Sequence, residues 1–138
     1  MRGIVHHIDL TVRDLDASRA FYAAVLEFLG YKLGHSDARG CDFDLVGGGA
    51  FQSIGIKRAN EKGATRRHDR YSPGLHHLAW TAASRDDVDR LWMLLQQIGA
   101  DVLDPPKEYP QYGSGYYAVF FADPDGIKLE YVFHPAEA

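Results

Sequence analysis

The stretch HHIDLT at residues 6–11 returns as HHLAWT at residues 76–81, so that every matched position lies 70 residues further along the chain. Around the first copy, in residues 4–12, polar and apolar side chains alternate. Such alternation is typical of a half-buried strand, and it puts His7 and Asp9 on one face and the apolar residues on the other. The duplicated stretch therefore predicts two modules that follow one plan and that each open with a strand.

A helix and three further strands are expected after each opening strand. Asp14 or Asp16 can cap a first helix that Gly30 ends, and Ser84 can cap a second helix that Gly99 ends. Strand-like segments follow near residues 31–34, 42–46 and 51–57 in the first half and near residues 101–103, 116–122 and 127–133 in the second. Each half reads β-α-β-β-β, which predicts an α+β fold of two βαβββ modules in tandem.

The 138 residues are expected to form a single domain, with module 1 at about residues 4–57 and module 2 at about residues 75–134. A basic linker over residues 58–74 joins them. Counted from Lys57, this segment holds six Lys or Arg residues and two acidic ones. It is either a solvated linker or a cationic loop over the pocket, and the second interpretation favours an anionic substrate such as a carboxylate or a phosphate.

Composition narrows the class of protein. With 46% hydrophobic and 25% charged residues the chain is typical of a soluble globular domain, and no apolar run reaches the roughly 18 residues that cross a bilayer. The one cysteine, Cys41, excludes an intrachain disulfide and favours a reducing, cytoplasmic setting. A net charge of −4 argues against a nucleic-acid partner, since such proteins usually carry a basic footprint.

His7, His77 and Glu130 form the candidate metal site. The two histidines hold equivalent places in the repeat, so an internal two-fold would bring them together. Glu130 interrupts an apolar strand, where a carboxylate is costly to bury unless it is paired or coordinated. Two imidazoles and one carboxylate suit a divalent ion such as Fe, Zn, Mn or Ni and leave positions for substrate. His6 and His76 are expected on the opposite face, as structural residues.

The same residues carry a family resemblance. The segments that carry it are His7–Asp14, Ser18 with Phe21-Tyr22, His77–Trp80 and Asp123–Glu130. Together they resemble the vicinal oxygen chelate superfamily, which contains glyoxalases, bleomycin resistance proteins and extradiol dioxygenases. The resemblance implies paired βαβββ modules that close a mixed sheet into a cup, a metal inside it and, usually, a homodimer. By position, His7, His77 and Glu130 fall on ligand positions of the family.

The reaction is less defined than the fold. Glyoxalase I enzymes usually add a fourth ligand, a Glu, near the end of the first module, where this chain has FQSIGI at residues 51–56. Gln52 is a candidate fourth ligand or substrate contact there, but it is a poor base. Fosfomycin-resistance transferases have Thr where this chain has Asp9. Extradiol dioxygenases use the same triad with Fe(II), although their common forms have four modules.

A metal-dependent lyase or dioxygenase that acts on a small oxygen-bearing substrate is therefore expected. The alternative is a binding protein of the bleomycin-resistance type, which sequesters a ligand without chemistry and generally lacks the metal triad. Candidates for substrate binding or for proton transfer behind the ligands are His68, Arg70, Tyr112, Tyr116 and Tyr117, by residue type.

Overall fold

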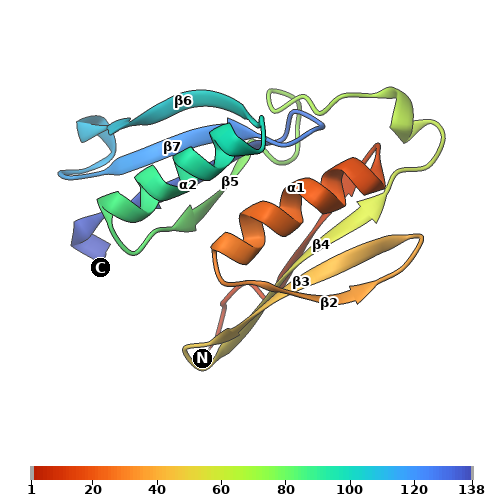
Figure 1. The fold of residues 1–138 in the computed structure, drawn as a ribbon, viewed down its shortest axis with the longest axis horizontal. Helices are drawn as coiled ribbons and strands as arrows, with labels where there is room; N and C mark the ends of the chain where they lie inside the picture. The colour runs from red at the N-terminus through yellow and green to blue at the C-terminus, as the bar shows by residue number, and fades with distance from the viewer. Residues whose placement is uncertain (1, 138) are drawn as a thin grey trace. The chain divides into compact units, whose positions relative to one another are not determined.

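The structure is a computed structural model that describes residues 2–137. It divides into two compact units, the first ending at Arg67 and the second beginning at His68, each with one helix on a four-stranded sheet (Figure 1). The boundary lies inside the segment expected to be a linker. Neither helix is long and apolar enough, within the described residues, to cross a membrane.

The first unit has the predicted βαβββ order. Its elements are β1 (His7–Val12), α1 (Leu15–Phe28), β2 (Lys32–Ser36), β3 (Gly40–Gly47) and β4 (Ala50–Arg58), followed by a short 3-10 turn at Gly63–Thr65. Asp14 is the N-cap of α1, because its side chain accepts a hydrogen bond from the backbone N–H of Ala17 at 3.1 Å. Gly30, with φ of 98°, ends the helix as predicted.

Strand pairing in the first unit joins the two ends of the module. The sheet order is β1-β4-β3-β2, and β1 runs parallel to β4 while the other neighbours are antiparallel. In this register Ser53 lies between His7 and Asp44, and Gly55 lies between Asp9 and Asp42. These six positions, of which Gly55 has no side chain, therefore form two adjacent rows of three across one face of the sheet.

The other face of this sheet packs on the helix. Strands β3 and β4 contact α1, and the buried side chains of the first unit include Val12, Phe43 and Ile56 of the sheet and Tyr22 and Leu26 of α1. Alternation along each strand thus sends apolar residues to α1 and leaves polar residues such as His7 on the free face, as predicted.

The second unit repeats the plan. Its elements are β5 (His77–Thr81), α2 (Arg85–Gln97), β6 (Asp101–Glu108), β7 (Tyr117–Ala122) and β8 (Lys128–Phe133), with 3-10 turns at Pro110–Tyr112 and Pro135–Glu137. The sheet order is β5-β8-β7-β6, and again the first strand is parallel to the last. The core of this unit joins Leu91 and Leu95 of α2 to Phe121 and Leu129 of the sheet.

Strand β6 is longer than the sequence predicts. The predicted segment stops at Leu103, whereas β6 continues through Pro105 and Pro106 to Glu108. Because β6 is the last strand in the sheet order, a proline there removes no hydrogen bond to a neighbour on its outer side. The register with β7 shifts on both sides of Asp104, and the second shift, between Asp104 and Lys107, spans the two prolines that cannot donate to the ladder.

One contact with Asp87 and one tight turn hold β8 in place. The α2 N-cap is Ser84, as predicted, and Asp87 in the first turn accepts from the Tyr131 hydroxyl at 2.5 Å. Before the strand, the Asp123 side chain accepts from the backbone N–H groups of Asp125 and Ile127, each at 2.8 Å. Tyr131 thus anchors β8 to the helix, and Glu130, one residue earlier, faces the other way.

We expect Tyr131→Phe to lower the free energy of unfolding by about 1 kcal/mol, because Asp87 loses a hydrogen bond between α2 and β8. Denaturant unfolding would measure it. Tyr71→Phe is the matched control, since the Tyr71 side chain is 78% exposed and we expect a change of less than about 0.5 kcal/mol. Equal losses in the two variants would contradict the anchoring role of Tyr131.

Candidate functional site

The free face of the second sheet holds a pocket of about 350 Å³. It is lined by His76, His77, Tyr112, Tyr116, Phe120, Lys128 and Glu130. Two of the three predicted metal ligands, His77 and Glu130, are therefore in one pocket. Their meeting follows from the parallel pairing of β5 with β8, in which His77 is opposite Lys128 and Ala79 is opposite Glu130. His77 and Glu130 are diagonal neighbours on one face.

Glu130 is the most constrained polar side chain of this pocket. It is 2% exposed, and its Oε1 lies 3.1 Å from Nε2 of His77. Its other oxygen, Oε2, accepts a hydrogen bond from the hydroxyl of Tyr116. A buried carboxylate with a partner on each oxygen is held in one orientation, since turning it would leave a charge without a donor.

His76 lies in the same pocket, contrary to the expectation that it faces away. Its Nδ1 is 2.8 Å from Nδ1 of His77, and the two rings meet edge to face. The alternation rule did not apply because β5 begins only at His77, so His76 lies before the strand. Burial lowers the pKa of His76 below its ordinary value, and the neighbouring cationic groups act in the same direction.

The predicted tyrosines divide between the two faces of the second unit. Tyr112 and Tyr116 line the pocket. Tyr117 does not, because its hydroxyl donates to Oδ1 of Asp89 on α2 at 2.6 Å. Tyr109, which the sequence did not single out, is buried against Phe120, and burial raises its pKa to about 12.

His68 and Arg70 do not line either pocket. The ring Nε2 of His68 contacts the backbone oxygen of Leu75 at 2.9 Å, within the loop that leads to β5. The guanidinium of Arg70 lies over the ring of Tyr71, 4.9 Å from its centroid. Both side chains contact neighbours in their own loop.

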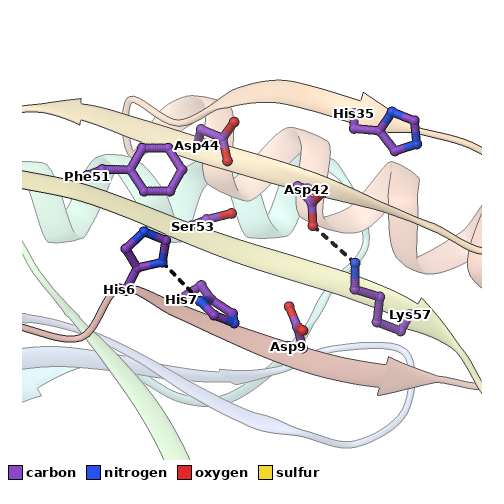
Figure 2. Close-up of a pocket in the computed structure, with 9 residues that line it drawn as sticks. All are labelled: His6, His7, Asp9, His35, Asp42, Asp44, Phe51, Ser53 and Lys57. Atoms are coloured by element: carbon purple, nitrogen blue, oxygen red, sulfur yellow. Dashed lines mark hydrogen bonds and ion pairs between the residues drawn. The ribbon is translucent and has the colours of Figure 1, made fainter.

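The first unit holds a second pocket, of about 380 Å³, on its free sheet face (Figure 2). It is lined by His6, His7, Asp9, His35, Asp42, Asp44, Phe51, Ser53 and Lys57. His6 and His7 repeat the histidine pair of the second unit, with their Nδ1 atoms 3.0 Å apart. His6 was also expected on the opposite face, and it too precedes its strand.

Gln52 does not line this pocket. Strand alternation places it on the face that carries Ile54 and Ile56, while Phe51 and Ser53 on either side face the pocket. Predicting the face on which Gln52 lies requires the register of β4, because a shift of one residue would place its side chain on the opposite face of the sheet. The structure gives Gln52 no place beside His7 on the pocket face.

Two residues after His7 and after His77, the first strand of each unit faces a partner position on the last strand. The acidic residue of this pair lies on the first strand in one unit and on the last strand in the other. In the second unit the pair is Ala79 on the first strand and Glu130 on the last. In the first unit it is Asp9 on the first strand and Gly55 on the last. A Cβ on Gly55 would collide with Oδ1 of Asp9. In this pair of first and last strands, each unit therefore carries its carboxylate on the strand opposite to that of the other unit.

The His77–Glu130 pair passes a geometric test for a divalent ion. Two donor atoms about 2.1 Å from a zinc-like ion, at angles of about 90° to 110°, lie about 3.0–3.4 Å apart. The 3.1 Å between Nε2 and Oε1 fits this range. Within residues 2–137, no three His, Cys, Asp or Glu side chains are grouped closely enough to hold an ion. His7 belongs to the other unit, so this pair supplies two candidate ligands.

Comparison with known proteins gives a family for this fold. Residues 4–131 match the family model of the Glyoxalase/Bleomycin resistance protein/Dioxygenase superfamily. The uncharacterized protein YqjT of Bacillus subtilis is 38% identical over 128 residues, which cover 93% of this chain and 97% of YqjT. The uncharacterized protein YwkD of the same organism is 30% identical over 129 residues, covering 91% of this chain and 93% of YwkD.

Solved structures agree with the sequence relatives. A crystal structure from Bacillus halodurans, described as a candidate glyoxalase, has a TM-score of 0.81 and 33% identity and covers 96% of this chain and 97% of its own. A lactoylglutathione lyase from Agrobacterium tumefaciens shares the fold, with a TM-score of 0.65 and 21% identity, and covers 94% of this chain and 92% of its own. The family match spans both βαβββ units, and this chain therefore belongs to the Glyoxalase/Bleomycin resistance protein/Dioxygenase superfamily.

Proposed function

We propose that the chain is a metal-dependent enzyme, a lyase or a dioxygenase, that acts on a small oxygen-bearing substrate. The proposed ligands of one divalent ion are His7, His77 and Glu130. The observation that carries this proposal is the buried carboxylate of Glu130, which lies 3.1 Å from His77 Nε2 in a pocket open to small molecules. When bound, an ion of this kind supplies Lewis-acid chemistry that polarises substrate oxygen atoms.

The residues around Glu130 have separable roles in this proposal. Tyr116 holds Oε2 and so directs Oε1 towards His77. Phe120 and Tyr112 supply an aromatic wall to the pocket, which limits the approach of water to the carboxylate. A homodimer, expected from the family resemblance, remains a prediction.

The paired histidines support the proposal because their contact tolerates either tautomer. A carboxylate only accepts, so His77 contacts Glu130 through Nε2–H, and in the neutral imidazole its Nδ1 then accepts from Nδ1–H of His76. Coordination through Nε2 requires that nitrogen to be unprotonated. His77 then carries its proton on Nδ1 and donates to Nδ1 of His76, whose own proton must move to Nε2, so the contact between the rings survives with its direction reversed.

We expect the metal-free chain to contain His77 as the Nε2–H tautomer and His76 as the Nδ1–H tautomer. Nitrogen NMR of the histidine rings distinguishes the two forms. Addition of Zn²⁺ is expected to convert His77 to the Nδ1–H tautomer, while His35, whose ring contacts Asp37, keeps its signals. A metal-free His77 that is already protonated on Nδ1 would contradict the proposed hydrogen-bond chain.

Metal loading tests the ligand set directly. After chelation and reloading with Zn²⁺, Mn²⁺, Ni²⁺ or Fe²⁺, we expect about one ion per chain in the parent protein and loss of that ion in His7→Ala and in Glu130→Ala, with both variants folded. His35→Ala is the matched control, since it removes a pocket histidine outside the ligand set.

Two results of this experiment would refute the assignment. Full metal retention in both His7→Ala and Glu130→Ala would exclude the proposed ligands. No stoichiometric metal, together with a melting temperature that chelation leaves unchanged, would favour a binding protein over a metal-dependent enzyme.

Tyr116→Phe tests how much the orientation of Glu130 matters. Without the Tyr116 hydroxyl the carboxylate is free to rotate, and we expect metal affinity to fall by about tenfold or more, as for other groups that orient a ligand. Titration calorimetry would measure this. Tyr117→Phe is the control, because its hydroxyl binds Asp89 on the other face and its loss should leave affinity unchanged.

A further inference from the structure

The pocket of the second unit contains a lysine whose charge is not paired with a carboxylate. Lys128 lines the pocket and is half-buried, and its ammonium lies over the ring of Phe120, with Nζ 4.6 Å from the ring centroid. It forms no hydrogen bond and no ion pair with any other described residue. Both oxygens of Glu130 are already in contact with His77 and Tyr116. The positive charge of Lys128 is therefore available to a ligand.

The strand register explains why this ammonium lies in the pocket. Lys128 is opposite His77 on β5 and opposite Ala122 on β7, while Phe120 is opposite Glu130. Lys128 and Phe120 are thus diagonal neighbours on the free face of the sheet. Ala122 carries only a methyl group, which leaves room for the long lysine side chain to reach the Phe120 ring.

The first unit has no counterpart of this lysine. Opposite His7, at the position that corresponds to Lys128, β4 carries Ser53. The lysine that lines the first pocket, Lys57, contacts Oδ1 of Asp42 at 3.2 Å. Among the described residues, only the pocket of the second unit therefore has a lysine without a carboxylate partner. An anionic ligand is expected there rather than in the first unit.

Aromatic rings give the same pocket an apolar surface beside the ammonium. Tyr112, Tyr116 and Phe120 line it, and the rings of Tyr112 and Tyr116 meet edge to face with their centroids 5.3 Å apart. Tyr109 is buried behind them, since its ring stacks on Tyr112 and meets Phe120 edge to face. A volume of about 350 Å³ is at the lower end of the range for small-molecule sites, so it suits a ligand with a single ring.

We propose that this pocket binds a small aromatic carboxylate, whose negative group pairs with Lys128 and whose ring packs on Tyr112 and Tyr116. An ammonium and a carboxylate form charge-assisted hydrogen bonds, which are stronger than neutral ones. Glu130 opposes an anion, but its carboxylate is 2% exposed and both of its oxygens have partners, whereas Lys128 is only half-buried. As the substrate of an enzyme, such a carboxylate rests on the proposed function, which uses the same pocket.

The origin of this charge preference differs from the one that the basic linker suggested. The linker interpretation places linker cations over the pocket, whereas Arg70 lies over Tyr71 in its own loop and lines neither pocket. Lys128 belongs to β8 itself. Its pairing with a carboxylate needs no metal ion and can be measured on the chelated full-length chain. Failure of metal loading would leave that measurement intact, and loss of the charge preference would leave the metal site intact.

Three probes separate the contribution of the charge from that of the ring. Benzoate, benzamide, which has the same shape without the charge, and acetate, which has the charge without the ring, would each be titrated into the chelated chain, with backbone amide NMR as the readout. We expect saturable binding of benzoate at millimolar concentrations, with shifts at Tyr112, Phe120 and Lys128, and binding weaker by about tenfold for benzamide and for acetate. Equal binding of benzamide, equal binding of acetate, shifts confined to the first unit, or no saturable binding of benzoate would each overturn the proposal.

Two variants of Lys128 and one control complete the test, with the amide spectrum of each variant reporting that it is folded. Lys128→Gln removes the charge, and we expect it to weaken benzoate binding by about tenfold and to leave benzamide binding unchanged. Lys128→Arg keeps the charge and should retain most of the affinity. Lys107→Gln is the matched control, because Lys107 also lies over an aromatic ring, with Nζ 5.0 Å from the centroid of Tyr109, but does not line the pocket.

Three results with these variants would show that Lys128 does not recognise the carboxylate. They are unchanged benzoate binding in Lys128→Gln, an equal loss of binding in Lys107→Gln, and a loss in Lys128→Arg as large as that in Lys128→Gln.

Discussion

In each unit the first strand runs parallel to the last, and this pairing decides which polar side chains can meet. Because β5 pairs with β8, the register places His77 diagonally across from Glu130, and the two contact each other. In the first unit the same pairing of β1 with β4 places His7 opposite Ser53. The helix covers the apolar face of each sheet, so the remaining face is free to carry the chemistry.

In the pocket of the second unit, the neighbouring side chains are arranged so that they offset the cost of burying the Glu130 carboxylate. A carboxylate at 2% exposure needs donors, and it has one from His77 and one from Tyr116. Each of these donors comes from a different segment, one at the start of β5 and one just before β7. Tyr131 ties the same strand to α2 from the opposite face. The orientation of one acidic side chain thus depends on contacts made on both sides of β8.

Much of this arrangement could be predicted because it follows from periodicity. The duplication, the caps Asp14 and Ser84 and the free-face position of His7 are local properties of the sequence. What could not be predicted depends on where strands begin and how they are paired. His6 and His76 lie just before their strands, where alternation does not hold, and Gln52 was displaced by one residue from the pocket face. The grouping of Asp9 with Asp42 and Asp44 required the register of three strands.

The reciprocal pairs, Asp9 with Gly55 and Ala79 with Glu130, limit how a duplicated module can diverge. An acidic side chain introduced at Gly55 would meet Asp9 at once, so that change becomes acceptable only after Asp9 has been replaced by a smaller residue. The effect of a mutation at one strand therefore depends on the residue already present on the other. In the first unit, the carboxylate of this pair can therefore move from β1 to β4 only through an intermediate in which neither of the two positions is acidic.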